Sequence, residues 1–366
     1  MTRAVLALRA PSANRVYTAA AGPLVLAEAR WVLGAHLGPG VVVRERTVGG
    51  MHALEVRARA EQTVDEDRLD TLLGLLSTTY GLFEIAGEGL LRPLEASSPL
   101  RHPEDLETIL KYPGKTNEQF TALLVNLAAS LSTRRSGLFD GTLSLLDPMC
   151  GRGTTLNRAL RLGLSPIGAD IDRKDVEAYR TFLTTWLRTH RYKHQISSTS
   201  LTVRGEQLGT RTLAELAPDK AAQRAGLAQQ VTVLGCDTAR LGEVLAARSV
   251  DAIVADLPYG VQHGAHGGGG VQRSPLEVLR RAAGTWRSLL RDGGGIALAV
   301  NRHTLDHDAA REALAAAGLT VLTRDGAFRH RVDQSIDRDV LLAVPSNHPR
   351  LEQLAALDAL QEETPT

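Results

Sequence analysis

Four aspartates, Asp147, Asp170, Asp237 and Asp256, each follow a short apolar segment of the length of a β-strand. The four segments are residues 141–146, 167–169, 231–235 and 250–255. Carboxylates accept hydrogen bonds from sugar hydroxyls and amines, and open parallel α/β sheets bind ligands at the carboxyl ends of their strands. We therefore expect the four side chains to meet at one edge of a parallel sheet, beside a nucleotide-like ligand.

Two glycines, Gly151 and Gly153, lie in the turn between the first segment and a helix expected to begin at Leu156. Glycines at a strand-to-helix turn let the backbone bend tightly and approach a ligand. The dinucleotide-binding pattern needs a third glycine at position 156, where this chain has leucine. The turn thus favours a nucleotide-like ligand and disfavours a dehydrogenase.

Three motifs follow one another: D-P-x-C-G-x-G-T from Asp147, G-x-D-I-D from Gly168 and D-L-P-Y-G from Asp256. Together they resemble S-adenosylmethionine-dependent methyltransferases of exocyclic amines, most closely the THUMP-associated tRNA guanosine-N2 methyltransferases (UPF0020-like), over residues 111–344. The resemblance implies a class I Rossmann-like α/β domain with a mostly parallel seven-stranded sheet. Leu257, where the motif usually has its first proline, matches the guanosine branch and disfavours adenine-specific DNA enzymes.

The resemblance also implies the position of the cofactor, S-adenosyl-L-methionine. Asp170 would hold its ribose, Asp237 would accept from its adenine amine, and Gly151 and Gly153 would pass close to its methionine part. Further cofactor-binding residues are expected at Asp147, Pro148, Cys150, Thr154, Ile171, Cys236, Thr238, Asp256 and Thr116. Cys150 is expected as a small packing residue, because methylation of an amine needs no nucleophilic thiol.

The segment Lys115, Thr116 and Asn117 stands before an apolar helix expected from Glu118 to Leu131. In the related enzymes the corresponding segment lies beside the methionine end of the cofactor. The alternative is a capped packing helix without ligand contact.

The catalytic motif is expected to restore the nucleophilicity of a ring-conjugated amine. Such an amine is a poor nucleophile because its lone pair is delocalised into the ring. The Asp256 carboxylate and the Leu257 carbonyl would bind the amine hydrogens and direct the lone pair at the methyl group, with Pro258 fixing the backbone. Tyr259 would stack on the substrate base, or alternatively fill the sheet as an aromatic plug.

The first 95 residues contain short elements in the order βαββαβ, which predicts a ferredoxin-like α+β domain. A proline-rich linker is expected at 96–110, the methyltransferase domain at 111–349 and a tail with a short, peripheral, fraying helix at 350–366. The THUMP-associated enzymes have a THUMP module after the ferredoxin-like unit. With only about 95 residues before the linker, a complete THUMP module is expected to be missing.

Four segments have more than one interpretation. The basic insertion at 188–209, within the longer stretch 188–228, would hold phosphate or a base, or would be a surface loop. The glycine-rich loop 264–270 would be a substrate lid or a connector. Arg329 or Arg331 would meet a phosphate or lie on the surface. Gly293 to Gly295 are expected to stop a helix at 280–290.

The composition limits the partners. The chain has a formal net charge of +1, 43% hydrophobic and 23% charged residues, so it lacks the marked basic excess of a dedicated duplex binder. The two cysteines do not form a disulfide pattern, no metal motif is present, and no apolar run reaches the ~18 residues of a membrane span. We expect a cytoplasmic enzyme without a metal.

Three functions are compatible with these features. The first is methylation of guanosine in tRNA or other RNA, supported by a stripe of arginines at spacings of two, Arg44, Arg46, Arg57 and Arg59, that would track a phosphate backbone with Arg188, Arg191 and Lys193. The second is methylation of a small nucleoside-like or amine-bearing metabolite. The third is a non-catalytic RNA-binding scaffold, which would not require the complete D-L-P-Y motif.

Overall fold

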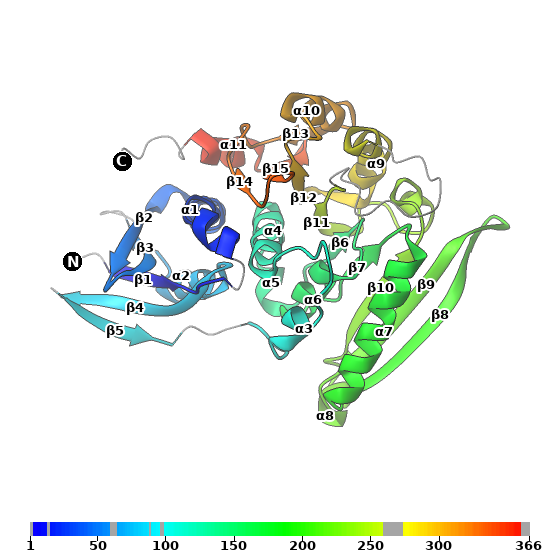
Figure 1. Ribbon diagram of the computed structural model, residues 1–366, viewed down its shortest axis with the longest axis horizontal. Helices are drawn as coiled ribbons and strands as arrows, with labels where there is room; N and C mark the ends of the chain where they lie inside the picture. The colour runs from blue at the N-terminus through cyan, green and yellow to red at the C-terminus, as the bar shows by residue number, and fades with distance from the viewer. Residues whose placement is uncertain are drawn as a thin grey trace.

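The computed structural model describes residues 3–12, 15–58, 64–87, 89–95, 99–258 and 274–359. Figure 1 shows two β-sheets, one at the N-terminal side of the molecule and one in its larger C-terminal part, with helices between and around them. Among the described residues, no helix is long and apolar enough to cross a membrane.

The N-terminal sheet is antiparallel, with strand order β2-β3-β1-β4-β5. Its elements are β1 (Ala4–Arg9), α1 (Arg15–Leu37), a 3₁₀ turn (Gly38–Gly40), β2 (Val41–Val48), β3 (Met51–Ala58), α2 (Glu66–Leu75), β4 (Thr79–Gly87) and β5 (Leu90–Leu94). The order β4-β1-β3-β2 with two helices is the predicted ferredoxin-like unit. Strand β5 is not part of the expected βαββαβ order. It contains Pro93, which an edge strand tolerates since its outer N–H needs no partner.

Over the described residues the second sheet has ten strands, and five of them run parallel in the order β12-β11-β6-β7-β10. Its strands are β6 (Leu145–Asp147), β7 (Ile167–Ala169), β8 (Lys193–Val203), β9 (Glu206–Ala217), β10 (Gln229–Gly235), β11 (Val250–Asp256), β12 (Leu290–Asn301), β13 (Leu319–Val321), β14 (His330–Arg331) and β15 (Asp337–Pro345). The predicted α/β fold class is confirmed, and β13 and β15 form the expected final antiparallel pair. The sheet exceeds seven strands because β8, β9 and β14 are added to it.

The helices of this part lie on both faces of the sheet (Figure 1). They are α3 (Asp105–Thr108), α4 (Glu118–Leu131), α5 (Gly137–Asp140), α6 (Thr154–Arg161), α7 (Arg173–Thr189), α8 (Lys220–Arg224), a 3₁₀ turn (Thr238–Glu243), α9 (Pro275–Leu289), α10 (His307–Ala316) and α11 (Leu351–Ala359). Most begin at a residue whose side chain accepts a backbone N–H, such as Asn117 before α4 and Asp172 before α7.

Three expectations from sequence are wrong. Residues 193–217 form the long hairpin β8–β9 rather than a surface loop, and β9 pairs with β10. The glycines at 293–295 lie inside β12 and do not stop the preceding helix, which already ends at Leu289. Helix α11 is not peripheral, because its Leu354 and Leu357 are buried against the core that contains α1.

Helix α4 joins the two parts of the molecule. Every residue from Phe120 to Leu131 is buried, and α4 contacts α1 on one side and β11 and β12 on the other. A buried polar contact crosses this junction, because Asn126 on α4 donates to Glu28 on α1 over 2.8 Å, and Glu28 also accepts from the Ser77 backbone N–H. Burial raises the pKa of Glu28, so its hydrogen bonds offset a desolvated carboxyl.

Glycine 295 sets the distance between α4 and β12. A Cβ added there would lie 2.3 Å from the Leu131 Cβ and 2.8 Å from the Ala128 carbonyl oxygen. We expect Gly295→Ala to lower the free energy of unfolding by about 1–3 kcal/mol, the usual effect of overpacking, in urea titrations followed by circular dichroism.

The control is Gly284→Ala on α9, where an added Cβ has no neighbour within 4 Å. It should leave stability unchanged or raise it by up to about 1 kcal/mol, because alanine favours helix. Equal stabilities of the two variants would show that α4 and β12 can separate without loss.

Candidate functional site

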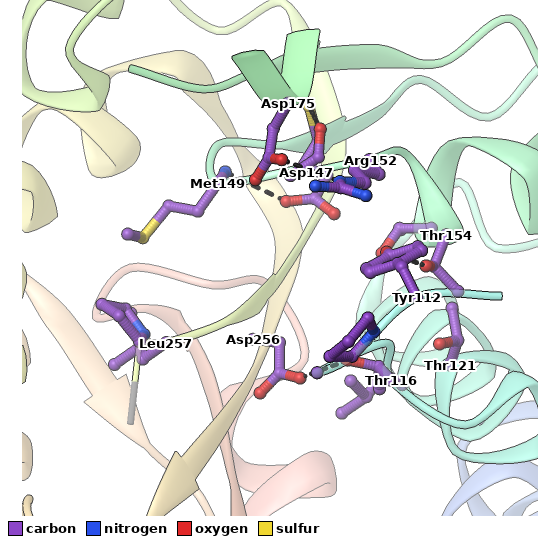
Figure 2. Close-up of a pocket in the computed structure, with 17 residues that line it drawn as sticks. Tyr112, Thr116, Thr121, Asp147, Met149, Arg152, Thr154, Asp175, Asp256 and Leu257 are labelled. Atoms are coloured by element: carbon purple, nitrogen blue, oxygen red, sulfur yellow. Dashed lines mark hydrogen bonds and ion pairs between the residues drawn. The ribbon is translucent and has the colours of Figure 1, made fainter. Parts of the chain in front are cut away.

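A cavity of about 300 Å³ lies at the carboxyl ends of β6 and β11. The chain leaves β6 toward β7 on one side, whereas β11 pairs with β6 on the other side, and such a reversal of strand order is where open α/β sheets bind ligands. The lining residues are Tyr112, Pro113, Gly114, Thr116, Thr121, Leu124, Asp147, Met149, Cys150, Gly151, Arg152, Thr154, Thr155, Asp175, Asp256, Leu257 and Pro258. Figure 2 shows side chains from the 112–124 segment facing those of the β6 turn and Asp256.

The glycine turn has the backbone that its sequence predicts. Gly151 and Gly153 both have positive φ angles, 49° and 79°. A Cβ at Gly153 would lie 2.3 Å from the Tyr179 ring, whereas a Cβ at Gly151 would have no neighbour within 4 Å. Gly153 therefore allows close packing of α7, and Gly151 leaves an open position beside the cavity.

Asp147 ends β6 and is 4% exposed. Its Oδ1 accepts the Met149 N–H over 3.0 Å. Burial raises the pKa of Asp147 to about 7, against the opposing effect of hydrogen bonds from Thr155 and Met149. The nearby carboxylates Asp170 and Asp256 raise it further, so the carboxyl ends of these strands concentrate negative charge in a poorly solvated place.

Asp170 supports the glycine turn from the neighbouring strand. Its Oδ2 accepts the Gly151 N–H over 2.8 Å and its Oδ1 accepts the Asp172 N–H over 2.8 Å. Burial raises the pKa of Asp170. The side chain does not line the cavity itself, and neither do Pro148 or Gly153. The next residue, Ile171, is 65% exposed, which leaves an apolar side chain beside the turn.

The predicted adenine-binding residues lie farther along the edge. Asp237 follows β10, accepts the Ala239 N–H over 3.0 Å, and forms an ion pair of 3.0 Å with Arg281 on α9. Thr238 accepts the indole N–H of Trp286 over 2.8 Å, and Cys236 is buried. These three residues do not line the cavity.

Asp256 ends β11 and faces the cavity (Figure 2). Its Oδ2 accepts the Thr116 hydroxyl over 2.6 Å and lies 3.5 Å from Nη2 of Arg338. Arg338 is 5% exposed, and its guanidinium lies 5.0 Å from the centre of the Phe120 ring. Leu257 and Pro258 also line the cavity, whereas Tyr259 and the loop 264–270 lie outside the described residues.

Several residues of the site were missed from sequence. Tyr112 lies 3.2 Å from Thr154 (hydroxyl to hydroxyl), and the Arg152 guanidinium lies over the Tyr112 ring and donates to Asp175 over 2.8 Å. The aromatic residue of the 112–117 segment was a usable signal. Arg338 gave no such signal, because it stands between Asp337 and Asp339 at the start of β15 and its partner Asp256 is distant in the sequence.

Four other residues, which were considered for the cofactor pocket or for a phosphate, contact protein groups instead. Lys115 donates to the Glu107 carbonyl oxygen and pairs with Glu118, and Asn117 caps α4, so neither lines the cavity. Arg329 pairs with Asp337, and Arg331 donates to the Asp333 carbonyl oxygen. Cys150 is buried below the turn, close to Gly168, and burial raises the pKa of its thiol, which agrees with a packing role.

Within the part of the chain that the structure describes, no group of three His, Cys, Asp or Glu side chains could hold a metal ion. His263 and His266 lie outside that part.

Comparison with known proteins gives a family match. Residues 114–316, more than half of the chain, match the family model described as UPF0020, RMKL-like, methyltransferase domain. No curated protein matches the sequence.

Solved structures similar to the chain include TrmN from Thermus thermophilus, 16% identical, with 94% of this chain and 99% of that chain covered and a TM-score of 0.36. Magnesium protoporphyrin IX methyltransferase from Synechocystis PCC 6803 with bound SAM is 16% identical, with 64% and 87% covered and a TM-score of 0.32. A 1,6-didemethyltoxoflavin-N1-methyltransferase from Burkholderia thailandensis is 16% identical, with 60% and 76% covered and a TM-score of 0.33.

The raised pKa of Asp147 predicts a pH-dependent stability. The unfolded carboxyl has a pKa of about 3.9, so between about pH 4 and pH 7 the folded state binds more protons and stability falls as the pH rises. Asp147→Asn removes this titration and keeps an oxygen that accepts from Met149. The stability of the wild type relative to this variant should fall by on the order of 2 kcal/mol from pH 5 to pH 8.

Urea titrations of both proteins at pH 5, 6.5 and 8 without added ligands measure this difference, and every other titrating group is common to both. Parallel pH profiles would mean that Asp147 ionises normally in the folded protein.

Proposed function

The chain belongs to the UPF0020 family of RMKL-like methyltransferase domains, and from this we propose that it methylates an exocyclic amine, that of guanosine in tRNA or other RNA. Membership makes it an S-adenosylmethionine-dependent methyltransferase. The observation that carries the proposal is that the Asp256-Leu257-Pro258 turn and the Asp147–Thr155 turn line one cavity. An amine acceptor and a methyl donor would thus lie side by side.

The residues present fit S-adenosylmethionine. The open position at Gly151 and the amino end of α6 form a cradle that a Cβ would fill. Burial disfavours the charged form of Asp147 and raises its pKa. The cationic amino group of the methionine part would favour that charged form, so the two groups suit each other. We assign the ribose of the cofactor to Asp170, because each oxygen of this carboxylate can accept a second hydrogen bond. The exposed Ile171 would make an apolar contact with the cofactor, and Asp237 would accept from the adenine amine.

The cofactor supplies an electrophilic methyl group, and the chain's own residues would prepare the amine. Asp256 and the Leu257 carbonyl accept its hydrogens. Thr116 and Arg338 contact the same Oδ2 of Asp256, so they hold the carboxylate in one orientation before substrate arrives, which is how fixed dipoles lower a barrier. The Thr116 contact also ties the start of α4 to the end of β11.

One observation favours the second candidate, a small amine-bearing substrate. Of the arginine stripe, Arg59 lies outside the described residues, whereas Arg46 on β2 and Arg57 on β3 both pair with Glu55. This pairing neutralises part of the charge that RNA would need. Against this, Arg188, Arg191 and Lys193 are exposed at the end of α7 and the start of β8. RNA therefore remains our first choice, and the domain limits given above remain a prediction.

We expect Asp170→Ala to weaken binding of S-adenosylmethionine at least tenfold in calorimetry, the ~1.4 kcal/mol that follows from lost hydrogen bonds to a carboxylate. Asp172→Ala is the matched control, because Asp172 also accepts a backbone N–H, but that of Lys174 at the start of α7, whereas Asp170 accepts that of Gly151 in the glycine turn. It should bind with nearly wild-type affinity. Equal affinities of wild type and Asp170→Ala would remove Asp170 from the cofactor site.

The reaction is tested with unmodified tRNA transcripts and radiolabelled cofactor, followed by mass spectrometry of nucleosides. The wild type should produce N-methylguanosine, and Asp256→Asn should lower kcat at least 100-fold, ~2.7 kcal/mol of transition-state stabilisation, with cofactor affinity changed only a few-fold.

Filter binding of bulk tRNA at two salt concentrations separates the two candidate substrates. Binding to RNA should weaken steeply with salt because phosphate contacts release counterions. No detectable tRNA binding at low salt, with cofactor binding intact, would reject RNA in favour of the small-molecule substrate.

A further inference from the structure

Four basic side chains gather at the end of α4 that lies away from the cavity. They are His36 in the last turn of α1, Arg68 on α2, Arg135 after α4, and Arg350 before α11; we call them the arginine cluster. Arg68 donates to Nδ1 of His36 over 3.3 Å, and its guanidinium lies 3.9 Å above the Phe139 ring. The four side chains are each partly exposed, so a ligand in solvent can reach part of each.

The cluster lacks compensating acid. Among the described residues, no carboxylate forms an ion pair with any of the four side chains, and Asp65 acts on Arg68 only at longer range. The like charges act on one another. Burial, then Arg68, Arg135 and Arg350, lower the pKa of His36 to about 3, and burial with Arg135 lowers the pKa of Arg350 to about 10. The positive charge here therefore lowers the stability of the folded chain.

Two buried nitrogens of the cluster have no hydrogen-bond partner among the described residues, Nε2 of His36 and Nη1 of Arg350. Because Arg68 donates to Nδ1, neutral His36 must carry its proton on Nε2. Both orphan atoms are therefore donors. Arg350 already donates from Nη2 to the Ala35 carbonyl oxygen at the end of α1, so the helix terminus accounts for one of its donors but not for Nη1.

Uncompensated cations and unsatisfied donors in one place favour the binding of an acceptor with negative charge. A guanidinium group is suited to a phosphoryl group, whose oxygens accept several charge-assisted hydrogen bonds, and the cluster has three of them. We propose that the arginine cluster is a binding site for a phosphoryl group, supplied by free phosphate or by the backbone of a nucleic acid. The site is separate from the reaction proposed above, because α4, with 14 residues, places it about 20 Å from Asp256.

Thermal unfolding with inorganic phosphate, against sodium chloride of equal ionic strength, tests the site. Phosphate should raise the Tm of the wild type, because a ligand that binds the folded state stabilises it. Arg135→Gln should abolish this rise while leaving the Tm without phosphate equal or higher, since repulsion is relieved. Arg134→Gln is the matched control: Arg134 is the neighbouring residue but is paired with Asp251, and it should keep the full response.

No phosphate-specific rise in the wild type, or a rise that Arg135→Gln retains, would overturn the proposal and leave the cluster as a set of helix-end contacts. A tRNA arm identifies the source of the phosphoryl group. If Arg135→Gln weakens tRNA binding and reduces its salt slope by about one unit, the group belongs to the nucleic-acid backbone. If tRNA binding is absent or unchanged while the phosphate response is lost, the ligand is free phosphate or a small phosphorylated molecule.

Discussion

The close approach of α4 to β12, which the glycine at 295 permits, is the constraint on which the site depends. With α4 pressed against the sheet on one side and against α1 on the other, its amino end can move little relative to β11. That end carries Thr116, whose hydroxyl meets Asp256. A contact between residues 140 positions apart is thus fixed by packing, and the carboxylate needs little reorganisation when a substrate binds. The N-terminal domain takes part in this arrangement, because α1 and α4 belong to one continuous core.

Asp256 and Asp147, the two carboxylates that end strands beside the cavity, have different chemical environments. Asp256 has a cation beside it, Arg338, and a hydroxyl donor. Asp147 is more deeply buried and, in the part of the chain described, receives hydrogen bonds from Met149 and Thr155, which are neutral. Two acids on adjacent strands therefore differ in what stabilises their charged forms, and such differences assign distinct roles to similar groups. From this contrast we infer that Asp256 accepts hydrogen bonds from the substrate amine and that Asp147 binds a cationic group.

How far the sequence predicts this structure depends on the range of the interactions involved. The turn at Gly151 and Gly153, the aspartates that end the strands and the βαββαβ order are local patterns, and the structure contains all three, although only Asp147 and Asp256 of the four aspartates line the cavity. Arg338 could not be assigned to Asp256, because the two are 82 residues apart and only the fold brings them together. The glycines 293–295 were misread as a helix stop since their cause, contact with Thr133, Leu131 and Leu290, is invisible in the local sequence. The hairpin β8–β9 was taken for a loop because its serines and threonines suit both.

The hairpin β8–β9 extends the sheet beyond β10, the edge strand of the seven-stranded sheet that was expected. Strand β9 extends the sheet beyond β10 with seven paired residues, and β8 covers β9 along nearly its whole length. The face of this extension toward α7 contains buried Ala214 and Leu216, which pack with Trp186 and Leu183 of the helix. His102 joins the same region through Tyr192 and Gln229, at 2.9 and 2.6 Å, so the segment before α4 is anchored to the extension. Because that segment leads into Tyr112 and Thr116, the hairpin lends rigidity to one wall of the cavity through contacts made well outside it.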